Sequence, residues 1–283
     1  MVNKLKFGVV ADPQYGNCEA KRNKDCQGSL ERMREAVEEF NRRELDFVAI
    51  LGDIVEDNEK DYAMIMAEIG KIQTKKVMMI GNHDYYAAGF QANDVAEAEK
   101  RALKNLGMSE RYYSFSVNGY RVIVMDTNEG LLEAGGGKMV DEVFRVEEKR
   151  KGETDYYFTS EHPWNGWIFQ EQREWIRREI LVAEEAGEKV IMMGHTPIFS
   201  QPTSSVRNGN EIAMMVREHE ESIVAVLAGH EHLGGLTMIG WVPQIVFRGM
   251  LLPGEATYSV VEVSGMDIKT EGFGRENQYR MVR

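Results

Sequence analysis

Val77-Met78-Met79-Ile80-Gly81-Asn82-His83-Asp84 is the most informative stretch of this 283-residue chain. Its apolar run predicts a buried strand, and the glycine predicts a sharp turn at the end of that strand. Three polar side chains that can coordinate a cation, transfer a proton or orient a neighbour follow at once. The same order, an apolar run and then ligand-type residues, recurs at residues 7–14, 48–53, 190–195 and 224–232.

Helical and extended patterns alternate around these runs. Apolar residues at helical spacing follow Ser29, the expected N-cap, and recur near residues 64–72 and 94–106. Asn118-Gly119 predicts a type I′ hairpin, and short strands are expected after His232. We therefore predict an α/β fold of two stacked mixed sheets flanked by helices, in which the strand ends build one site.

The candidate ligands run from Asp12 to His232, so one site uses most of the chain. We expect a single domain over residues 1–283 for this reason. Residues from about 130 to 167 keep no clean periodicity, and a long segment of this kind inside a domain is typical of a functional lid. We expect a lid-like insertion there.

Composition narrows the possible partners. The formal charge of −12 disfavours sequence-independent binding to nucleic acid, although bound cations could still attract a phosphate substrate. No run has the length of a membrane span, and no apolar core of a signal peptide is present. We expect no membrane partner, a cytoplasmic location, and free thiols at Cys18 and Cys26. The sequence makes no prediction about oligomeric state.

Seven side chains make up the candidate ligand set: Asp12, Gln14, Asp53, Asn82, His195, His230 and His232. Each motif alone could be an ordinary turn, and the prediction depends on their conjunction. Seven groups are too many for one small divalent ion with an open position, but they suit two ions that share a carboxylate, and we assign that bridge to Asp53. Carboxylate, carboxamide and imidazole together favour Mn, Fe, Co or Zn over calcium, with Mg also possible. Gln14 in place of an imidazole favours Mn²⁺.

Such a pair of ions predicts phosphoryl transfer to a metal-bridging hydroxide. The departing oxygen then needs a proton, which His83 could donate, with Asp84 holding the imidazole in orientation. Trp167 belongs to the expected lid and could close over a nucleoside. Further aromatic side chains near the ligands could stack on a base: Tyr15, Tyr85, Tyr86 and Phe90. Simple loop packing is the alternative for each of these aromatic residues.

Taken in order, the motifs resemble those of the calcineurin-like metallophosphoesterases. The resemblance covers nearly the whole chain and implies a four-layer α-β-β-α sandwich. It also implies two ligand groups that share Asp53. The first ion would be held by the residues Asp12, Gln14, Asp53 and His232. The second ion would be held by the residues Asp53, Asn82, His195 and His230.

Gln14 departs from the usual histidine of that family. One branch, the manganese-dependent ADP-ribose/CDP-alcohol diphosphatases, shares this departure. Three further stretches resemble the branch: Asn165-Gly166-Trp167, in which Trp167 itself departs from it, and residues 232–235 and 272–275. The resemblance implies hydrolysis of the phosphoanhydride in a small nucleoside diphosphate compound. The alternatives are a phosphomonoesterase, a cyclic-nucleotide phosphodiesterase with the same ligands, and, more remotely, a non-catalytic scaffold of the same fold.

Overall fold

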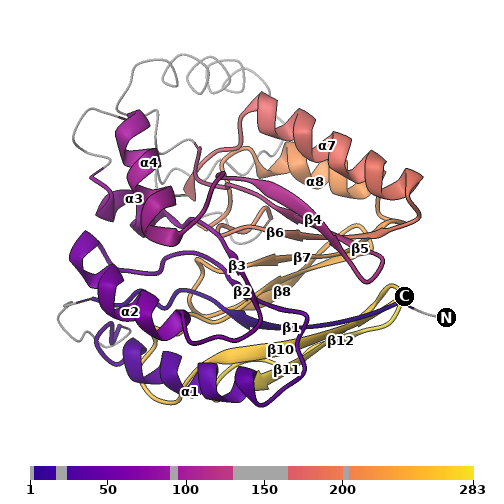
Figure 1. The fold of residues 1–283 in the computed structure, drawn as a ribbon. Coiled ribbons are helices and arrows are strands. Elements are labelled where there is room, and N and C mark those ends of the chain that lie inside the picture. Colours follow the sequence, from indigo (N-terminus) through magenta and orange to yellow (C-terminus); the bar gives the residue numbers. More distant parts are fainter. Residues whose placement is uncertain (1–2, 17–23, 90–94, 130–164, 200–203) are drawn as a thin grey trace.

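Two six-stranded sheets form the centre of the computed structural model (Figure 1), which describes residues 3–16, 24–89, 95–129, 165–199 and 204–283. The first sheet has the strand order β12-β11-β10-β1-β2-β3. Its strands are β1 (Lys4–Val10), β2 (Phe47–Ile50), β3 (Lys75–Met78), β10 (Tyr258–Ser264), β11 (Asp267–Phe273) and β12 (Arg280–Met281).

The second sheet has the order β4-β5-β6-β7-β9-β8. Its strands are β4 (Tyr113–Val117), β5 (Tyr120–Val124), β6 (Lys189–Met193), β7 (Ile223–Ala228), β8 (Gly235–Ile239) and β9 (Val242–Val246). Both sheets are mixed. Strands β1, β2 and β3 are parallel neighbours, and so are β5, β6 and β7. Antiparallel pairs join β10 to β1 and β11, β4 to β5, and β8 to β9.

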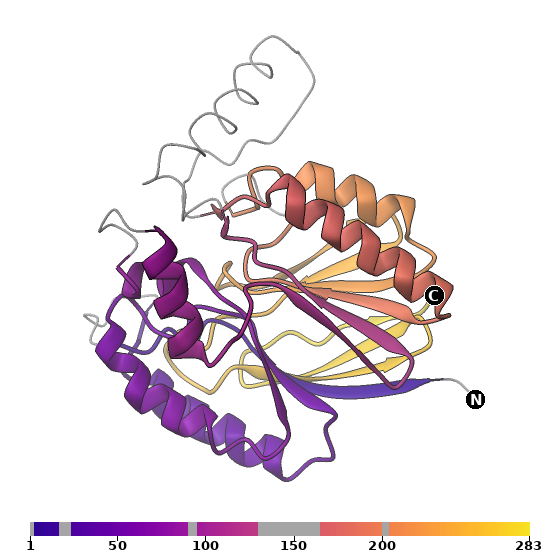
Figure 2. The same cartoon turned by 45° about the horizontal axis from the view of Figure 1, so that its top comes forward.

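Helices cover the outer face of each sheet, as Figure 2 shows from a second direction. The first sheet is covered by α1 (Ser29–Asn41), the short η1 (Glu59–Asp61), α2 (Tyr62–Ile69), α3 (Asn82–Ala87) and α4 (Val95–Leu106). The second sheet is covered by α7 (Gln170–Glu185) and α8 (Gly209–Glu218). The predicted arrangement of two mixed sheets flanked by helices is confirmed.

Burial on both faces explains why the ligand-bearing strands read as continuous apolar runs. In β2, Phe47 and Ala49 belong to the core between the two sheets, while Val48 and Ile50 pack under the helices. All four side chains are buried. Successive side chains of a strand point to opposite faces, so a central strand in a four-layer fold has no solvent-facing position. Its first polar residue therefore appears only where the strand ends.

Some of the turns, helix caps and strands predicted from the sequence agree with the structure, and others do not. The Asn118-Gly119 hairpin is confirmed, because both residues have positive φ (50° and 79°), as a type I′ turn requires. The prediction for Ser29 was wrong, since Gly28 is the N-cap and Ser29 is the first, buried residue of α1. The short strands expected after His232 are present as β8 to β12.

The expectation of free thiols was wrong for Cys26, which is disulfide-bonded and buried. Cys18 lies outside the described residues. Disulfides are rare in a reducing cytosol, so this bond does not support the expected cytoplasmic location, which stays a prediction. No described helix combines the length and hydropathy needed to cross a bilayer. Most of the expected lid lies outside the described residues, which resume at Asn165.

The two sheets are held together partly by the ring of Phe47. It stacks on Phe7 at 4.7 Å between ring centroids and meets Phe115 of the second sheet edge-on at 5.6 Å. We expect Phe47→Ala to lower the free energy of unfolding by about 3–5 kcal/mol, because it leaves a cavity between the layers. Denaturant unfolding would measure this, with the exposed Trp241→Ala as a control that should change stability by less than about 0.5 kcal/mol. Equal midpoints for the two variants would contradict the role assigned to this ring.

Candidate metal centre

The predicted ligands lie in turns that follow five strands, and the fold brings these turns together. Asp12 and Gln14 follow β1, Asp53 follows β2, and Asn82 opens α3 after β3. His195 follows β6, and His230 and His232 follow β7. The backbone N–H groups of two turns donate across the site: that of Gln14 to the carbonyl of Asp53 at 2.7 Å, and that of His230 to the carboxylate of Asp12 at 3.0 Å.

Backbone strain is concentrated at these turns. Among the described residues, only five non-glycine residues have positive φ, and one of them is Asn118 of the hairpin. The other four are predicted ligands: Asp12 (46°), Gln14 (45°), Asp53 (50°) and His230 (66°). Each left-handed residue of this kind costs on the order of 1–3 kcal/mol and persists only where the surrounding structure enforces it. The strained backbone at these turns therefore lowers the stability of the protein, and it directs the four side chains toward the candidate metal centre.

Gly81 shows how closely two of the turns approach. A Cβ atom at this position would lie 2.0 Å from Oδ1 of Asp53 and 2.4 Å from its backbone nitrogen. No side chain fits in that space, so the glycine is required for the turn after β3 to reach the turn after β2. The backbone N–H of His83 then donates to the same Oδ1 atom at 2.8 Å.

Four potential donor atoms surround one point. The Nε2 atom of His195 lies 3.2 Å from Oδ2 of Asp53, 3.2 Å from Oδ1 of Asn82 and 3.2 Å from Nδ1 of His230. Donors about 2.1 Å from a metal are separated from one another by roughly 3.0–3.4 Å. These four side chains could therefore hold a divalent cation with little rearrangement.

A second group of donors lies beside the first. Asp12 Oδ1 is 3.9 Å from Nε2 of His232. Gln14 is fully buried, and both polar atoms of its side chain lack a hydrogen-bond partner in the described part of the chain. A buried amide without partners is costly, and a cation next to its oxygen would remove that cost. These residues also fit a metal, although they are less closely gathered than the first group.

Protonation of the site follows from burial and neighbouring charge. Burial raises the pKa of Asp12 to about 7, against the opposing effect of His195. Burial lowers the pKa of His232 to about 4 and that of His230 well below its ordinary value, so both rings are neutral at pH 7, as metal-binding imidazoles must be. Burial also lowers the pKa of His195, but the charge of Asp53 outweighs it and brings the value to about 9.

His83 lies at the edge of the site with a different set of partners from those expected. Burial lowers its pKa, yet Asp53 and then Asp57 raise it to about 9. Its Nδ1 atom lies 2.8 Å from Oδ1 of Asp57 and also contacts the carbonyl oxygen of Glu56. A bound cation would offset the charge of Asp53 and lower this pKa.

The expected orienting role of Asp84 was wrong. Its carboxylate is fully buried and accepts hydrogen bonds from the backbone N–H groups of Ile54 and Gly81 and from the hydroxyl of Tyr62, at 2.7–3.0 Å. Consecutive residues of a helix do not face each other, so Asp84 points away from the ring of His83. It ties the start of α3 to the turn after β2, while Asp57 contacts the imidazole.

A cavity of about 330 Å³ opens beside the ligands, and its lining includes Tyr86 and Ser204 together with Asp53, Asn82, His83, His230 and His232. Tyr86 is the one predicted aromatic contact on this wall, with its ring edge-on to His83 at 5.6 Å. The other three described candidates do not line it. Tyr15 packs against the core under the helices. Tyr85 and Trp167 are buried, and the hydroxyl of Tyr85 donates to Asp126. Phe90 lies outside the described residues.

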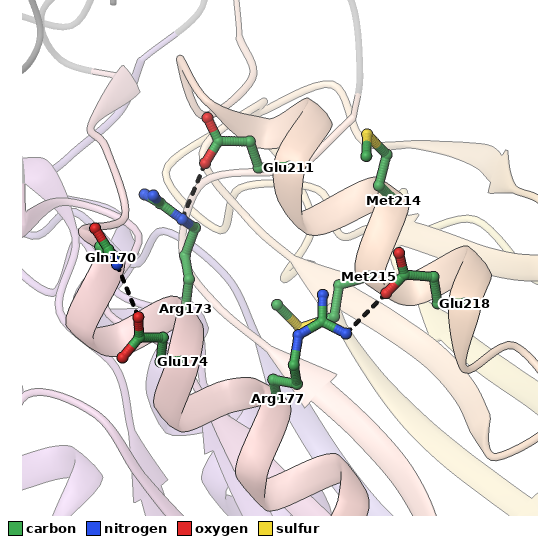
Figure 3. Close-up of a pocket in the computed structure, with 8 residues that line it drawn as sticks. All are labelled: Gln170, Arg173, Glu174, Arg177, Glu211, Met214, Met215 and Glu218. Carbon is green, nitrogen blue, oxygen red and sulfur yellow. Dashed lines mark hydrogen bonds and ion pairs between the residues drawn. The ribbon is translucent and has the colours of Figure 1, made fainter.

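A hollow of about 290 Å³ also lies between α7 and α8, and none of the candidate ligands lines it (Figure 3). Ion pairs span it, with Arg173 2.9 Å from Glu211 and Arg177 2.8 Å from Glu218. Because these charges are matched, the hollow lacks the concentrated donors of the metal centre.

Sequence reasoning assigned no role to Asn165, which the structure places against a ligand. Its Oδ1 atom lies 2.8 Å from Nε2 of His230, and its side chain is fully buried. The signals in the sequence were the resemblance of residues 165–167 to the diphosphatase branch and the Asn-Gly pair ahead of α7, and an Asn-Gly pair equally suits a surface turn.

Known proteins resemble the chain over most of its length. It is 27% identical over 260 residues to a manganese-dependent ADP-ribose/CDP-alcohol diphosphatase of Arabidopsis thaliana, covering 82% of this chain and 81% of the relative. A protein of the same name from Mus musculus is 24% identical and covers 96% of this chain, which in turn covers 91% of it.

Among solved structures, a dimetal phosphatase from Danio rerio superposes with a TM-score of 0.78 at 18% identity, covering 98% of both chains. This likeness confirms the fold. The family model of calcineurin-like phosphoesterases matches residues 5–234, which include all seven candidate ligands. The chain therefore belongs to the calcineurin-like phosphoesterase family.

Proposed function

We propose that this phosphoesterase hydrolyses the phosphoanhydride bond of small nucleoside diphosphate compounds, such as ADP-ribose or CDP-alcohols, with two divalent ions and preferentially Mn²⁺. The names of the relatives support the substrate class and the metal. The observation that carries the proposal is the group of four donor atoms around His195 Nε2, next to the unpartnered amide of Gln14.

We assign the ligands to two overlapping sets, as the family resemblance implies. Asp53 belongs to the group around His195 Nε2, its charge also acts on Asp12, and it is the proposed bridge. One ion would take Asp12, Gln14, Asp53 and His232, and the other would take Asp53, Asn82, His195 and His230. When bound, divalent ions at such sites act as Lewis acids toward phosphoryl oxygens and activate water. The protein's part is to hold the donors and to place a proton donor beside them.

His83 is the proposed proton donor to the leaving oxygen. It lines the cavity next to the ligands, and the pair formed with Asp57 keeps the ring oriented and protonated. Its backbone N–H donates to Asp53, which fixes the backbone from which the ring extends. The proton would leave from Nε2, because Nδ1 faces Asp57 and the carbonyl of Glu56.

The cavity favours a small substrate. Its volume of about 330 Å³ lies at the lower end of the range typical of small-molecule sites. Tyr86 offers a partly exposed ring on its wall, on which a base or ribose could pack. The acidic surface argues against a nucleic-acid substrate.

A substrate panel tests the proposal directly. With Mn²⁺ supplied, we expect the highest kcat/KM for ADP-ribose or a CDP-alcohol, and lower values for p-nitrophenyl phosphate, p-nitrophenyl phosphodiesters and cyclic nucleotides. Asp53→Asn preserves the shape of the side chain but removes its charge, so it should lose bound metal and nearly all turnover. Glu44→Gln, an exposed change of the same kind, should retain both. A preference for monoesters or cyclic nucleotides would replace the proposed substrate class.

The acid role of His83 predicts a dependence on the leaving group. We expect His83→Ala to lower kcat by about 10²–10⁴ for nucleotide leaving groups and by much less for p-nitrophenol, which needs no protonation. Metal content by elemental analysis should be unchanged, and His219→Ala, which removes the histidine at the end of α8 that contacts Glu184, should behave as wild type. Equal losses for both leaving groups would show that His83 positions substrate instead.

Asp57 and Asp84, the two carboxylates near His83, should differ in their roles, with Asp57 affecting catalysis and Asp84 affecting stability. Asp57→Asn should lower kcat with the same leaving-group dependence as His83→Ala, because it weakens the contact that orients the ring. Asp84→Asn should instead lower the free energy of unfolding by about 1–3 kcal/mol, since three buried donors lose their ionised acceptor. Steady-state kinetics and denaturant unfolding on both variants separate the roles, and the reverse result would restore the original assignment of Asp84.

A further inference from the structure

We infer that Asn165 is a positioning residue for the metal ligand His230, which it holds in one tautomer and one ring orientation. The inference deepens the proposed function and rests on its assignment of His230 to a metal. It does not require that the substrate class be correct. The argument begins with the two nitrogen atoms of the His230 ring.

The ring of His230 has one nitrogen on each side. Nδ1 faces the other donors and lies 3.2 Å from Nε2 of His195. Nε2 lies on the opposite side, 2.8 Å from Oδ1 of Asn165. An amide oxygen only accepts hydrogen bonds, so Nε2 must carry the proton. The lone pair is then on Nδ1, which is the atom that faces the donors.

His195 is held by the same kind of contact. Its Nδ1 atom donates to the backbone carbonyl of Leu51 at 2.7 Å, so Nε2 is the nitrogen that faces the donors and that would bind a metal once it loses its proton. Metal-binding histidines generally donate their second N–H to a carbonyl or carboxylate that fixes the tautomer. For His195 the acceptor is the backbone next to Asp53. For His230 it is a side chain distant in the sequence, so one substitution can remove it.

Asn165 can serve this purpose because its own backbone is fixed. Gly166 has a φ of +67°, and a Cβ there would lie 2.0 Å from the carbonyl oxygen of Thr127. Two residues further on, the backbone N–H and carbonyl of Ile168 form hydrogen bonds of 3.0 and 2.7 Å with the side-chain amide of Asn208. The segment therefore enters the site in one conformation.

Thr127 and Asn128 connect this segment to two other ligand turns. The hydroxyl of Thr127 accepts from the backbone N–H of Thr196, next to His195, at 2.9 Å. The side chain of Asn128 donates to the carbonyl of Ile80, two residues before Asn82, at 3.1 Å. The turn after β5 supplies no predicted ligand, yet it touches the segments that carry Asn82, His195 and Asn165. It sets where Asn165 lies relative to the donors.

Three substitutions test the inference. Asn165→Leu keeps the approximate size of the side chain and removes the acceptor, while Asn165→Asp keeps an acceptor oxygen. Gly166→Ala leaves the amide in place but should displace it, because of the clash with Thr127 and the positive φ. Asn105→Leu, a change of the same type on α4 where the amide contacts Glu59, serves as the control. Thermal unfolding of the metal-free proteins confirms that each variant is folded, and Asn165→Ala replaces the leucine variant if that one is not.

The first measurement is the tautomer of His230 in metal-free protein, read from nitrogen-15 NMR of the imidazoles and assigned with His230→Gln. The second is the affinity for Mn²⁺ by calorimetry. We expect wild type and Asn165→Asp to carry the proton on Nε2. In Asn165→Leu and Gly166→Ala the other tautomer should become populated, and the dissociation constant for Mn²⁺ should rise about 10–100-fold. Asn105→Leu should match wild type in both measurements.

The outcomes separate this inference from the proposed function. An unchanged tautomer or an unchanged Mn²⁺ affinity in Asn165→Leu would overturn the inference, and so would failure of the wild-type protein to bind Mn²⁺. A wild-type protein that binds Mn²⁺ with the expected tautomer but hydrolyses no nucleoside diphosphate compound would overturn the proposed substrate class alone.

Discussion

Asp53 is the residue on which the rest of the site depends. Its left-handed backbone turns the chain after β2 so that Oδ2 faces His195 while Oδ1 accepts the backbone N–H of His83. Its carbonyl also accepts the N–H of Gln14, which joins the turns after β1 and β2. Burial alone would raise the pKa of this carboxyl, but the charges of His195 and His83 keep it below its ordinary value. An ionised carboxylate is thus kept inside the protein, where a cation gains most from it.

The four-layer fold explains why such a centre can exist. Both sheets present the carboxyl ends of parallel strands at the same place, and the apolar layer between them keeps the strands rigid. Polar side chains appear only in the turns, which strained backbone and a missing Cβ at Gly81 bring within hydrogen-bond distance. The free energy gained by burying the apolar core therefore offsets the cost of the strained backbone and the buried polar groups at the site. The imidazoles are held by acceptors outside the donor group, namely the carbonyl of Leu51 and the amide of Asn165.

Two of the errors made from sequence have the same physical origin. Asp84 and Tyr85 follow the ligand Asn82 closely, and proximity along the chain suggested proximity to the substrate. They lie in a helix, however, where consecutive side chains point in different directions. Asp84 turns toward Tyr62 and the backbone of Ile54, and Tyr85 turns toward Asp126. Only His83 and Tyr86 remain on the side of the cavity. Asp57 and Asn165 were missed because no sequence pattern showed that their side chains contact His83 and His230.

The amino-acid pattern was sufficient to predict the apolar strands, the turns that end them and the identity of the seven ligand-type side chains. Those features are local, since a strand buried on both faces must be apolar and its first polar residue marks its end. It also determined the hairpin at Asn118-Gly119, whose conformation depends on two residues alone. Three features became visible only in the folded protein. Asp57 rather than Asp84 contacts His83, Asn165 contacts His230, and the amide of Gln14 lacks a hydrogen-bond partner among the described residues. Those outcomes depend on directions and distances between segments far apart in the chain, which no local pattern encodes.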